Sequence, residues 1–497
     1  MTTTHPTDAG TTPVLEVRNP ATQDVVGTYP IHGPDEVGAA VEQARIAAEW
    51  WQGIGYAERR KRLDAFRGVI ARRINQLAGV IHEEMGKPHS DAALEVALVL
   101  DHIAWAGKNA GKVLGKRRSP VGMVNAHLGA TVEYRPLGVI GVIGPWNYPV
   151  FTPMGSIVYA LAAGNAVVFK PSEFTPGVGA WLVDSFKQVV PEHPVFQLVT
   201  GDGSTGAALC RSGVDKVAFT GSTATAKRVM ATCAETLTPI VAECGGKDAL
   251  LVDEDADLAA AAEAAAWGGI ANAGQSCVGV ERVYVHSKVY DEFTRLLSDQ
   301  VSSVRAGGDA GAPVGPITMP SQVDIITRHV EEAVARGARV IAGGGPTEGQ
   351  VVQPTLLVDV PEDASAVTEE TFGPTLVLRK VADMDEALAL TNASRYHLAA
   401  SVFSKRRGRE IADRIRSGMV AVNSVFTFAV VPSVPFGGVG DSGFGRIHGE
   451  DGLREFCTPH AVVRQKFAPP LKLMTLQRTK QAEERLNQII GLLHGRK

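Results

Sequence analysis

The chain has few cysteines, and none of them falls in a pattern that would indicate a metal site or a disulfide framework. Its 497 residues include five cysteines, and neither a CxxC pair nor an HExxH motif occurs. A structural or catalytic zinc site therefore has no support, and we expect no metal ligands. A sparse, odd set of cysteines in a long chain is typical of free thiols in a reducing compartment, so we expect a cytoplasmic protein.

An excess of basic charge is also missing. The 49 Lys and Arg residues against 53 Asp and Glu residues give a net charge of −4, and no basic stripe runs along the chain. We therefore expect no nucleic-acid partner. Residues 1–12 lack the basic and apolar regions of a signal peptide, and we expect a disordered tail there.

Charged residues are absent from the segment 136–169. A run of that length could span a bilayer, but prolines and asparagines interrupt it. We predict instead a buried strand over 139–143, a turn, a short buried helix and a second strand over 166–169. The expectation is therefore that this segment is protein core and that no integral membrane segment occurs.

Helical periodicity and short β-like runs alternate along the rest of the chain. Apolar residues repeat with helical spacing over 34–51, 58–84 and 91–114. Later strand-like and helix-like runs alternate, which argues for parallel sheets with crossover helices. The predicted fold class is therefore α/β, with two parallel-sheet domains that meet near 243–246. The later strands are expected at 195–200, 214–220, 239–243, 250–252, 283–286, 339–342, 400–403 and 420–423, and the later helices at 175–190, 222–235, 258–270, 288–304, 322–336, 383–391 and 408–417.

A small sulfur nucleophile and an isolated carboxylate stand in two separate segments rich in small residues. Cys277 ends the segment ANAGQSC at 271–277, and Glu243 begins the segment ECGGK at 243–247. Such a pair suits covalent catalysis, because a thiol can attack and a carboxylate can activate the water that releases the product. A single cysteine is more often a small buried hydrophobic residue, so the surrounding motifs must decide.

Several short motifs occur together across nearly the whole chain. They are PWNYP at 145–149, KPSE at 170–173, FTGS at 219–222, ECGGK at 243–247, GQSC at 274–277, EETFGP at 369–374, and PFGG at 435–438 with SGFGR at 442–446. In kind, order and approximate spacing they resemble the motifs of the NAD(P)-dependent aldehyde dehydrogenase superfamily. Each motif alone is weak, but the set leaves little room for coincidence.

The resemblance implies catalytic roles for three residues. Cys277 is the implied nucleophile, whose thiolate adds to an aldehyde carbonyl, and the Asn147 side chain with the Cys277 backbone N–H is the implied oxyanion site. Hydride transfer to a nicotinamide then leaves a thioester, which Glu243 is implied to hydrolyse by activating water. Relatives that pass the acyl group to coenzyme A commonly lack this carboxylate, so a free acid is the expected product. The alternatives are a helix cap for Asn147 and a carboxylate bonded to Lys247 for Glu243.

The implied cofactor is NAD, with NADP as the alternative. Lys170 and Glu173 are implied contacts to the adenosine ribose, where a carboxylate repels a 2′-phosphate and so favours NAD. Glu370 is the implied contact to the nicotinamide ribose, with Phe372 beside the nicotinamide; solvated surface carboxylates are the alternative for both glutamates. The full set of expected cofactor residues is Ile143, Pro145, Trp146, Lys170, Ser172, Glu173, Gly203, Phe219, Gly221, Ser222, Glu370 and Phe372.

A GxGxxG sequence at 201–206 taken alone would suggest a dinucleotide fingerprint. It lacks the acidic residue expected about 20 positions further on, which would fall near Gly221. We expect instead that the strand-to-helix turn at 220–222 presents its N–H groups to the pyrophosphate. The loop at Gly201 is expected to line the adenine side.

The substrate is the least specified part of the site. Relatives that oxidise succinate semialdehyde often carry an arginine about nine positions after the Trp of the WN motif, where this chain has Gly155. Because burying a substrate carboxylate without compensation is costly, we expect an uncharged aliphatic or aromatic aldehyde of medium size. A succinate-semialdehyde-type dehydrogenase is the alternative, and a cofactor-independent thiol esterase is an alternative from another class. The candidate tunnel residues are Tyr148, Phe151, Trp267, Phe426 and Phe428.

The resemblance also implies a domain organisation and an oligomer. A Rossmann-like NAD-binding domain is expected over 1–117 and 137–243, a catalytic domain over 244–460, and a small β oligomerisation element over 118–136 and 461–468. A homodimer or homotetramer is the expected state. The tail 469–497 carries a helical apolar stripe, which we expect to pack on its own subunit or a partner; a weak membrane-surface contact or a cap over the tunnel is the alternative. The stripe consists of Leu486, Ile489, Ile490 and Leu493.

Overall fold

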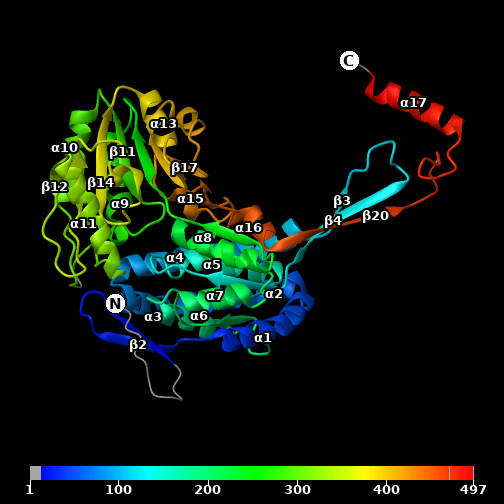
Figure 1. Ribbon diagram of the computed structural model, residues 1–497, viewed down its shortest axis with the longest axis horizontal. Helices are drawn as coiled ribbons and strands as arrows, with labels where there is room; N and C mark the ends of the chain where they lie inside the picture. Colours follow the sequence, from blue (N-terminus) through cyan, green and yellow to red (C-terminus); the bar gives the residue numbers. More distant parts are fainter. Residues whose placement is uncertain (1–12, 310, 470, 496–497) are drawn as a thin grey trace. The chain divides into compact units, whose positions relative to one another are not determined.

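The chain folds as an α/β protein around two mainly parallel sheets, which confirms the predicted fold class (Figure 1). The computed structural model describes residues 13–309, 311–469 and 471–495. The described residues form two compact units, of which the larger contains those up to 113 together with 136–458. The expected N-terminal tail, residues 1–12, and the last two residues, 496–497, lie outside the described residues.

The first sheet of the larger unit has the strand order β19-β9-β8-β5-β6-β7, and only β19 runs antiparallel to its neighbour. From β5 the chain adds β6 and β7 on one side, and then returns through α7 to add β8 and β9 on the other. Open parallel sheets bind ligands at the carboxyl ends of the strands where the order reverses in this way. The strands are β5 (Val139–Ile143), β6 (Ala166–Lys170), β7 (Phe196–Leu198), β8 (Lys216–Thr220), β9 (Ile240–Glu243) and β19 (Gly443–Phe444).

The helices around this sheet explain the long uncharged segment. Strands β5 and β6 are buried along their whole length, and so is nearly all of α5 between them, which confirms the predicted strand, turn, helix and strand. Helix α5 contacts β5, β6, α2 and α16, and nearly all of its residues are buried. The helices of this part are α1 (Pro34–Gly53), α2 (Gly55–Arg72), α3 (Ile74–Met85), α4 (His89–Leu114), α5 (Phe151–Ala163), α6 (Pro176–Lys187), α7 (Gly203–Arg211) and α8 (Thr223–Ala234).

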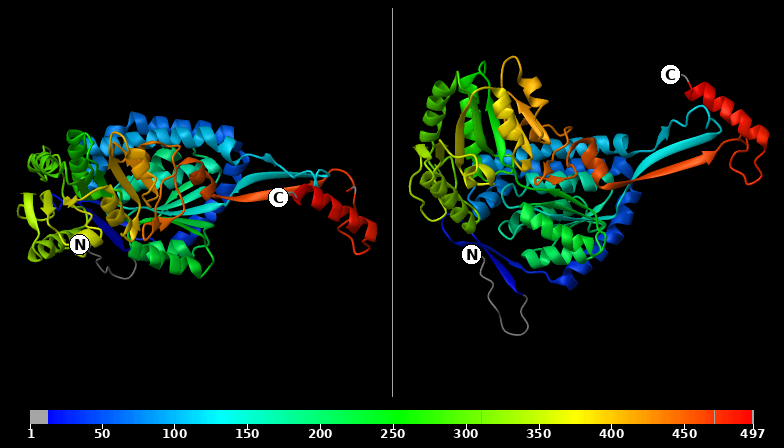
Figure 2. Two further views of the ribbon diagram at one scale, coloured as in Figure 1. Left: turned by 90° about the horizontal axis from the view of Figure 1, so that it is seen from above. Right: turned by 45° about the horizontal axis from the view of Figure 1, so that its top comes forward.

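The second sheet of the larger unit has the order β12-β13-β14-β11-β10-β16-β17, with β12 antiparallel to β13. Successive residues of a strand point to opposite faces, and both faces are covered here (Figures 1 and 2). Leu250 and Val252 of β10 pack with α9 and α10, whereas Ala249 and Leu251 pack with α13 and α14. The strands are β10 (Asp248–Val252), β11 (Val280–His286), β12 (Arg339–Gly343), β13 (Thr355–Val358), β14 (Thr375–Val381), β16 (Ala399–Phe403) and β17 (Met419–Val422).

Shorter elements complete the larger unit. Two small antiparallel pairs are formed by β1 (Val14–Arg18) with β2 (Val25–Pro30), and by β15 (Tyr396–His397) with β18 (Val439–Gly440). The remaining helices are α9 (Leu258–Ile270), the 3-10 turn η1 (Ala271–Gly274), α10 (Tyr290–Ser302), α11 (Pro320–Ala335), α12 (Ser365–Thr368), α13 (Met384–Asn392), α14 (Gly408–Ala412), α15 (Thr427–Val430) and α16 (Gly449–Glu455).

The smaller unit contains a three-stranded sheet and a helix. The sheet has the order β20-β4-β3, formed by β3 (Arg117–Ser119), β4 (Leu128–Pro136) and β20 (Cys457–Gln465). Strand β20 is at an edge and mostly exposed. Helix α17 (Lys480–His494) confirms the expected C-terminal helix, and none of its residues is buried.

Three sequence expectations need adjustment. The helix expected over 58–84 is two helices, because the backbone leaves helical geometry at Arg73. The helix expected over 408–417 ends at Ala412. Strands β13 and β14 were not expected, although each is a short apolar run. In the part of the chain that the structure describes, no helix is long and apolar enough to cross a membrane.

Candidate active site

The carboxyl ends of neighbouring strands bring the predicted motifs together. Ile143 at the end of β5 is in register with Lys170 at the end of β6 and with Phe219 of β8. The next residue of β8, Thr220, is in register with Glu243 at the end of β9. Residues separated by up to a hundred positions therefore meet at one edge of the sheet, on both sides of the switch point.

Glu243 is a buried carboxylate. Its side chain is 4% exposed, and neither carboxylate oxygen has a hydrogen-bonding partner among the described residues. Burial raises its pKa to about 7, and the nearby Cys277 thiol and Thr220 hydroxyl lower that pKa only partly. Neither neighbour makes a bond of ordinary hydrogen-bond geometry. A carboxyl group with this pKa can both take up and release a proton near neutral pH.

Cys277 follows a backbone turn of uncommon geometry. Asn272 and Ala273 in η1 have φ values of 54° and 55°, a left-handed conformation that side chains other than glycine seldom adopt. Gly246 packs against this segment so closely that a Cβ there would lie 2.4 Å from the Cys277 carbonyl oxygen. Cys277 as a residue is partly exposed, but desolvation and the neighbouring Glu243 carboxylate raise the pKa of its thiol well above the ordinary value.

Asn147 is held against the cysteine segment. Its side-chain Nδ2 donates a hydrogen bond of 3.0 Å to the carbonyl oxygen of Gln275. A primary amide carries two N–H groups, and this bond uses one of them. The Asn147 carbonyl accepts bonds from Lys87 Nζ at 2.8 Å and from Asn272 Nδ2 at 3.0 Å. Asn147 precedes α5 but does not cap it, because α5 has no side-chain cap.

A buried ion pair supports the turn that carries Asn147. Lys87 Nζ pairs with Glu95, and both side chains are almost fully buried. Glu95 Oε1 also accepts from the backbone N–H groups of Val150 and Phe151 at 2.8 and 3.0 Å. The pair therefore fixes the middle of the turn between β5 and α5 and the start of α5. No sequence pattern singled out Lys87 or Glu95.

Lys247 does not neutralise Glu243. Its ammonium group pairs with Glu281 and donates to the Thr371 hydroxyl at 3.1 Å. Glu281 in turn accepts from the backbone N–H groups of Thr371 and Phe372 at 2.9 to 3.1 Å. The alternative of Glu243 as a structural partner of Lys247 is therefore wrong, and Lys247 instead orders the segment next to Glu370.

Lys170 and Glu173 lie together at the end of β6. Lys170 Nζ is 3.7 Å from a Glu173 carboxylate oxygen, and burial lowers the pKa of Lys170. Ser172 Oγ donates a hydrogen bond to Glu173 Oε2 at 3.2 Å. The Glu173 side chain is about one third exposed. Because its carboxylate contacts both Lys170 and Ser172, it is not an isolated surface group.

The starts of α7 and α8 also lie after strand ends. Asp202 caps α7 by accepting from Ser204, and a Cβ at Gly203 would meet no atom within 4 Å. Ser222 caps α8 by accepting from Thr225. A Cβ at Gly221 would lie 2.8 Å from the Phe219 ring, so a side chain there would displace that ring. Each helix start presents backbone N–H groups, which suit an anion.

Glu370 and Phe372 approach the same edge from the catalytic part of the chain. Glu370 Oε1 accepts from the Gly246 N–H at 3.0 Å, and a Cβ at Gly245 would lie 2.2 Å from both carboxylate oxygens. Burial and the neighbouring Glu281 raise the pKa of Glu370 to about 8. The Phe372 ring meets the Trp146 ring edge to face at 5.5 Å, so Trp146 and Phe372 are neighbours.

The expected tunnel residues contact different neighbours. Tyr148 is partly buried, with Lys87 Nζ 4.0 Å from its ring centre. Trp267 and Phe426 have ring centres 5.2 Å apart, although Trp267 is 46% exposed. Phe428 is 7% exposed and packs on Phe436. Phe151 contacts two histidine rings, those of His102 and His448.

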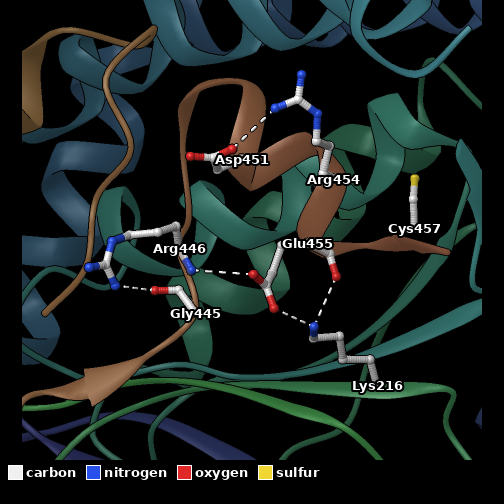
Figure 3. Close-up of a pocket in the computed structure, with 7 residues that line it drawn as sticks. All are labelled: Lys216, Gly445, Arg446, Asp451, Arg454, Glu455 and Cys457. Atoms are coloured by element: carbon white, nitrogen blue, oxygen red, sulfur yellow. Dashed lines mark hydrogen bonds and ion pairs between the residues drawn. The ribbon is translucent and has the colours of Figure 1, made fainter. Parts of the chain in front are cut away.

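A polar hollow elsewhere on the larger unit is distinct from this site (Figure 3). It encloses about 460 Å³, and none of the expected catalytic, cofactor or tunnel residues lines it. Its charged groups pair with one another, as Lys216 does with Glu455 and Arg454 with Asp451. The lining residues are Lys216, Gly445, Arg446, Asp451, Arg454, Glu455 and Cys457.

Comparison with known proteins assigns the chain to a family. The model of the aldehyde dehydrogenase family matches residues 7–462. The chain therefore belongs to the aldehyde dehydrogenase family, and the site is that of an oxidoreductase with a Rossmann-like fold.

Several relatives resemble most of the chain. The 4,4'-diapolycopene aldehyde oxidase of Methylomonas sp is 38% identical over 88% of this chain and 83% of its own length. The glutarate-semialdehyde dehydrogenase of Pseudomonas putida is 34% identical over 90% of this chain and 94% of its own length. Among solved structures, PnpE of Pseudomonas sp. WBC-3 in complex with nicotinamide adenine dinucleotide is 31% identical, covers 92% of this chain and 95% of its own, and gives a TM-score of 0.87.

Proposed function

We propose that the protein oxidises an uncharged, medium-size aldehyde to the carboxylic acid with NAD as the hydride acceptor. The observation that carries the proposal is the buried Glu243 carboxylate, which has no hydrogen-bonding partner among the described residues and lies beside the Cys277 thiol. A carboxylate in this state is costly to keep buried. Its retention beside a thiol fits a proton acceptor for the thiol or for a water molecule.

The proposed reaction takes place on the Cys277 sulfur. The thiol proton passes to Glu243 or solvent as the sulfur adds to the aldehyde carbon, giving a thiohemiacetal whose oxyanion is stabilised by Asn147 and the Cys277 backbone N–H. When bound, NAD would accept the hydride from this carbon, and Cys277 would then hold the acyl group as a thioester. Once the thiol proton has passed to solvent, the ionised Glu243 removes a proton from water, which attacks the thioester. The acid is released, and the departing Cys277 thiolate takes up a proton to restore the free thiol.

The described residues fit an NAD molecule at the switch point. Glu173 and Lys170 would hold the adenosine ribose, and the α8 start at Ser222 would hold the pyrophosphate. Glu370, whose carboxylate lies against Gly245, would hold the second ribose. The remaining proposed contacts are Ile143, Pro145, Trp146, Ser172, Gly203, Phe219, Gly221 and Phe372. This assignment makes 137–243 with the chain before 118 the cofactor domain, and 244–460 the catalytic domain.

The preference for an uncharged substrate is supported by the surroundings of Gly155. A Cβ at Gly155 would lie 2.6 Å from His448 Nε2, so the space next to this position is already filled by a ring. Burial lowers the pKa of His448 well below its ordinary value, so this ring supplies no positive charge for a substrate carboxylate. The proposed tunnel residues Tyr148, Phe151 and Phe428 are aromatic, and Trp267 and Phe426 form its outer part.

An aldehyde panel tests the proposal. Hexanal, benzaldehyde and succinate semialdehyde are supplied with NAD or NADP, and reduced cofactor is followed. We expect NADH from hexanal or benzaldehyde with a higher kcat/KM than from succinate semialdehyde. A higher kcat/KM for succinate semialdehyde would contradict the uncharged substrate class and favour a succinate-semialdehyde-type dehydrogenase. Ester hydrolysis at full rate without NAD, with no NADH from any aldehyde, would replace the reaction with that of a thiol esterase.

We also propose a cytoplasmic homodimer or homotetramer. The five free cysteines suit a reducing compartment. Strand β20 has an open edge, with Val462 and Val463 exposed, and an exposed edge strand of this kind is a ready site for a second subunit. The exposed helix α17 would join the same assembly or touch a membrane surface. Light scattering of the full chain, and flotation with anionic vesicles, distinguish these outcomes.

A further inference from the structure

Two histidine rings lie in contact inside the larger unit, next to the proposed tunnel residue Phe151. His102 is on α4, and His448 immediately precedes α16; their ring centres are 4.1 Å apart. The Phe151 ring lies 5.4 Å from His102 and 5.7 Å from His448. Phe436 lies 5.4 Å from His448 and also contacts Phe428. The pair therefore adjoins Phe151 directly and is separated from Phe428 by the Phe436 ring.

The two histidines differ in their hydrogen bonds. His102 Nε2 donates to the Ala429 carbonyl at 3.0 Å, and its Nδ1 lies 3.3 Å from the Tyr159 hydroxyl. His448 is 1% exposed, and neither of its ring nitrogens has a hydrogen-bonding partner among the described residues. Buried polar groups are normally paired, and leaving one unpaired costs stability. The unpaired imidazole therefore points to a ligand.

The backbone and the facing helix both accommodate His448. Its φ value is 63°, an uncommon conformation for a residue with a side chain. Its Nε2 approaches α5 at Gly155, where a Cβ would lie 2.6 Å away. The ring can occupy this position because Gly155 has no side chain and because the His448 backbone is left-handed. The burial that lowers the pKa of His448, and of His102 to about 4, keeps both rings neutral.

We propose that His448 is a substrate-recognition residue whose imidazole forms a hydrogen bond with an uncharged oxygen atom, a hydroxyl or carbonyl, on the carbon chain of the aldehyde. A neutral imidazole has one donor nitrogen and one acceptor nitrogen, and a hydroxyl group can form a hydrogen bond with either. It lacks the positive charge that a buried carboxylate needs. The inference rests on the proposed function and adds a preferred class of substrate to it, the hydroxy- or oxo-substituted aldehydes.

Matched substrates test this assignment. The kcat/KM values of hexanal, octanal and decanal are compared with those of their ω-hydroxy derivatives, in the wild type, His448→Leu and the control His89→Leu, which alters an exposed histidine. We expect at least one hydroxyaldehyde to exceed its parent by on the order of tenfold in the wild type, the size of one hydrogen bond. That ratio falls to about one in His448→Leu and is retained in His89→Leu.

The outcomes separate the inference from the proposed function. NADH formation from the parent aldehydes without a hydroxyl preference in the wild type overturns the role of His448 and leaves the proposed function in place. Absence of NADH from every aldehyde overturns both. A preference that persists in His448→Leu also overturns the role. If His448→Leu does not fold, His448→Phe, which keeps a ring but has no donor or acceptor, takes its place. Loss of the preference at an unchanged Tm supports the assignment, and a preference that persists overturns it.

Discussion

Lys247 pairs with Glu281, and this contact leaves Glu243 without a cation although the two residues are four positions apart in one motif. Glu281 also holds the backbone of Thr371 and Phe372. One buried ion pair thus orders the segment that presents Glu370, while the carboxylate of Glu243 stays available beside Cys277. The ECGGK motif therefore combines a proton acceptor with a structural cation.

Removal of the Lys247 charge is expected to destabilise the fold. In Lys247→Met the Glu281 carboxylate remains buried without its cation, which we expect to lower the free energy of unfolding by about 3–5 kcal/mol. Lys288→Met is the control, because the Lys288 pair with Glu254 is largely exposed and such pairs contribute about 0–1 kcal/mol. Denaturant unfolding of both variants measures the difference. Equal losses would contradict the structural role of Lys247.

Glu243→Gln is expected to stall the reaction after hydride transfer. The thioester still forms, but water is no longer activated, so a burst of NADH precedes slow turnover. Because a base acts in its ionised form, wild-type turnover should rise with pH through about 7, the pKa of Glu243. That inflection should be missing from the variant. Equal loss of burst and turnover would assign Glu243 another role.

Gly245→Ala tests the position of Glu370. The new Cβ would lie 2.2 Å from the Glu370 carboxylate oxygens, so that carboxylate must move from its bond to Gly246. We expect the KM for NAD to rise roughly tenfold, the size of one lost hydrogen bond. Gly38→Ala in α1 is the matched control, since a Cβ there meets no atom within 4 Å. An unchanged KM for NAD in Gly245→Ala would remove Glu370 from the cofactor site.

The sequence predicts the parts of this molecule that depend on local pattern. Alternating runs gave the parallel sheets, and the buried segment around α5 was recognised because its prolines stand between apolar runs. Strand β14 could have been found from its apolar run after Pro374. The motifs also singled out Cys277 and Glu243, which the structure brings together although Glu243 ends β9 and Cys277 follows η1.

Partners that are distant in the chain had no such signal. The bonds from Lys87 to Asn147 and from Lys247 to Glu281 span 60 and 34 positions, and no periodicity or spacing rule connects them. His448 is another example, since nothing in the sequence around it shows that its ring faces Gly155. Such contacts depend on how the strands and helices pack, so they become visible only when the fold is known.

The most direct test of the central claim is the rate of NADH formation by Cys277→Ala with hexanal. Loss of the covalent nucleophile is expected to lower kcat/KM by at least roughly three orders of magnitude. Cys457→Ala, which removes another partly exposed thiol, should keep the wild-type rate. Near-normal NADH formation by Cys277→Ala would remove the sulfur from the mechanism and contradict the account.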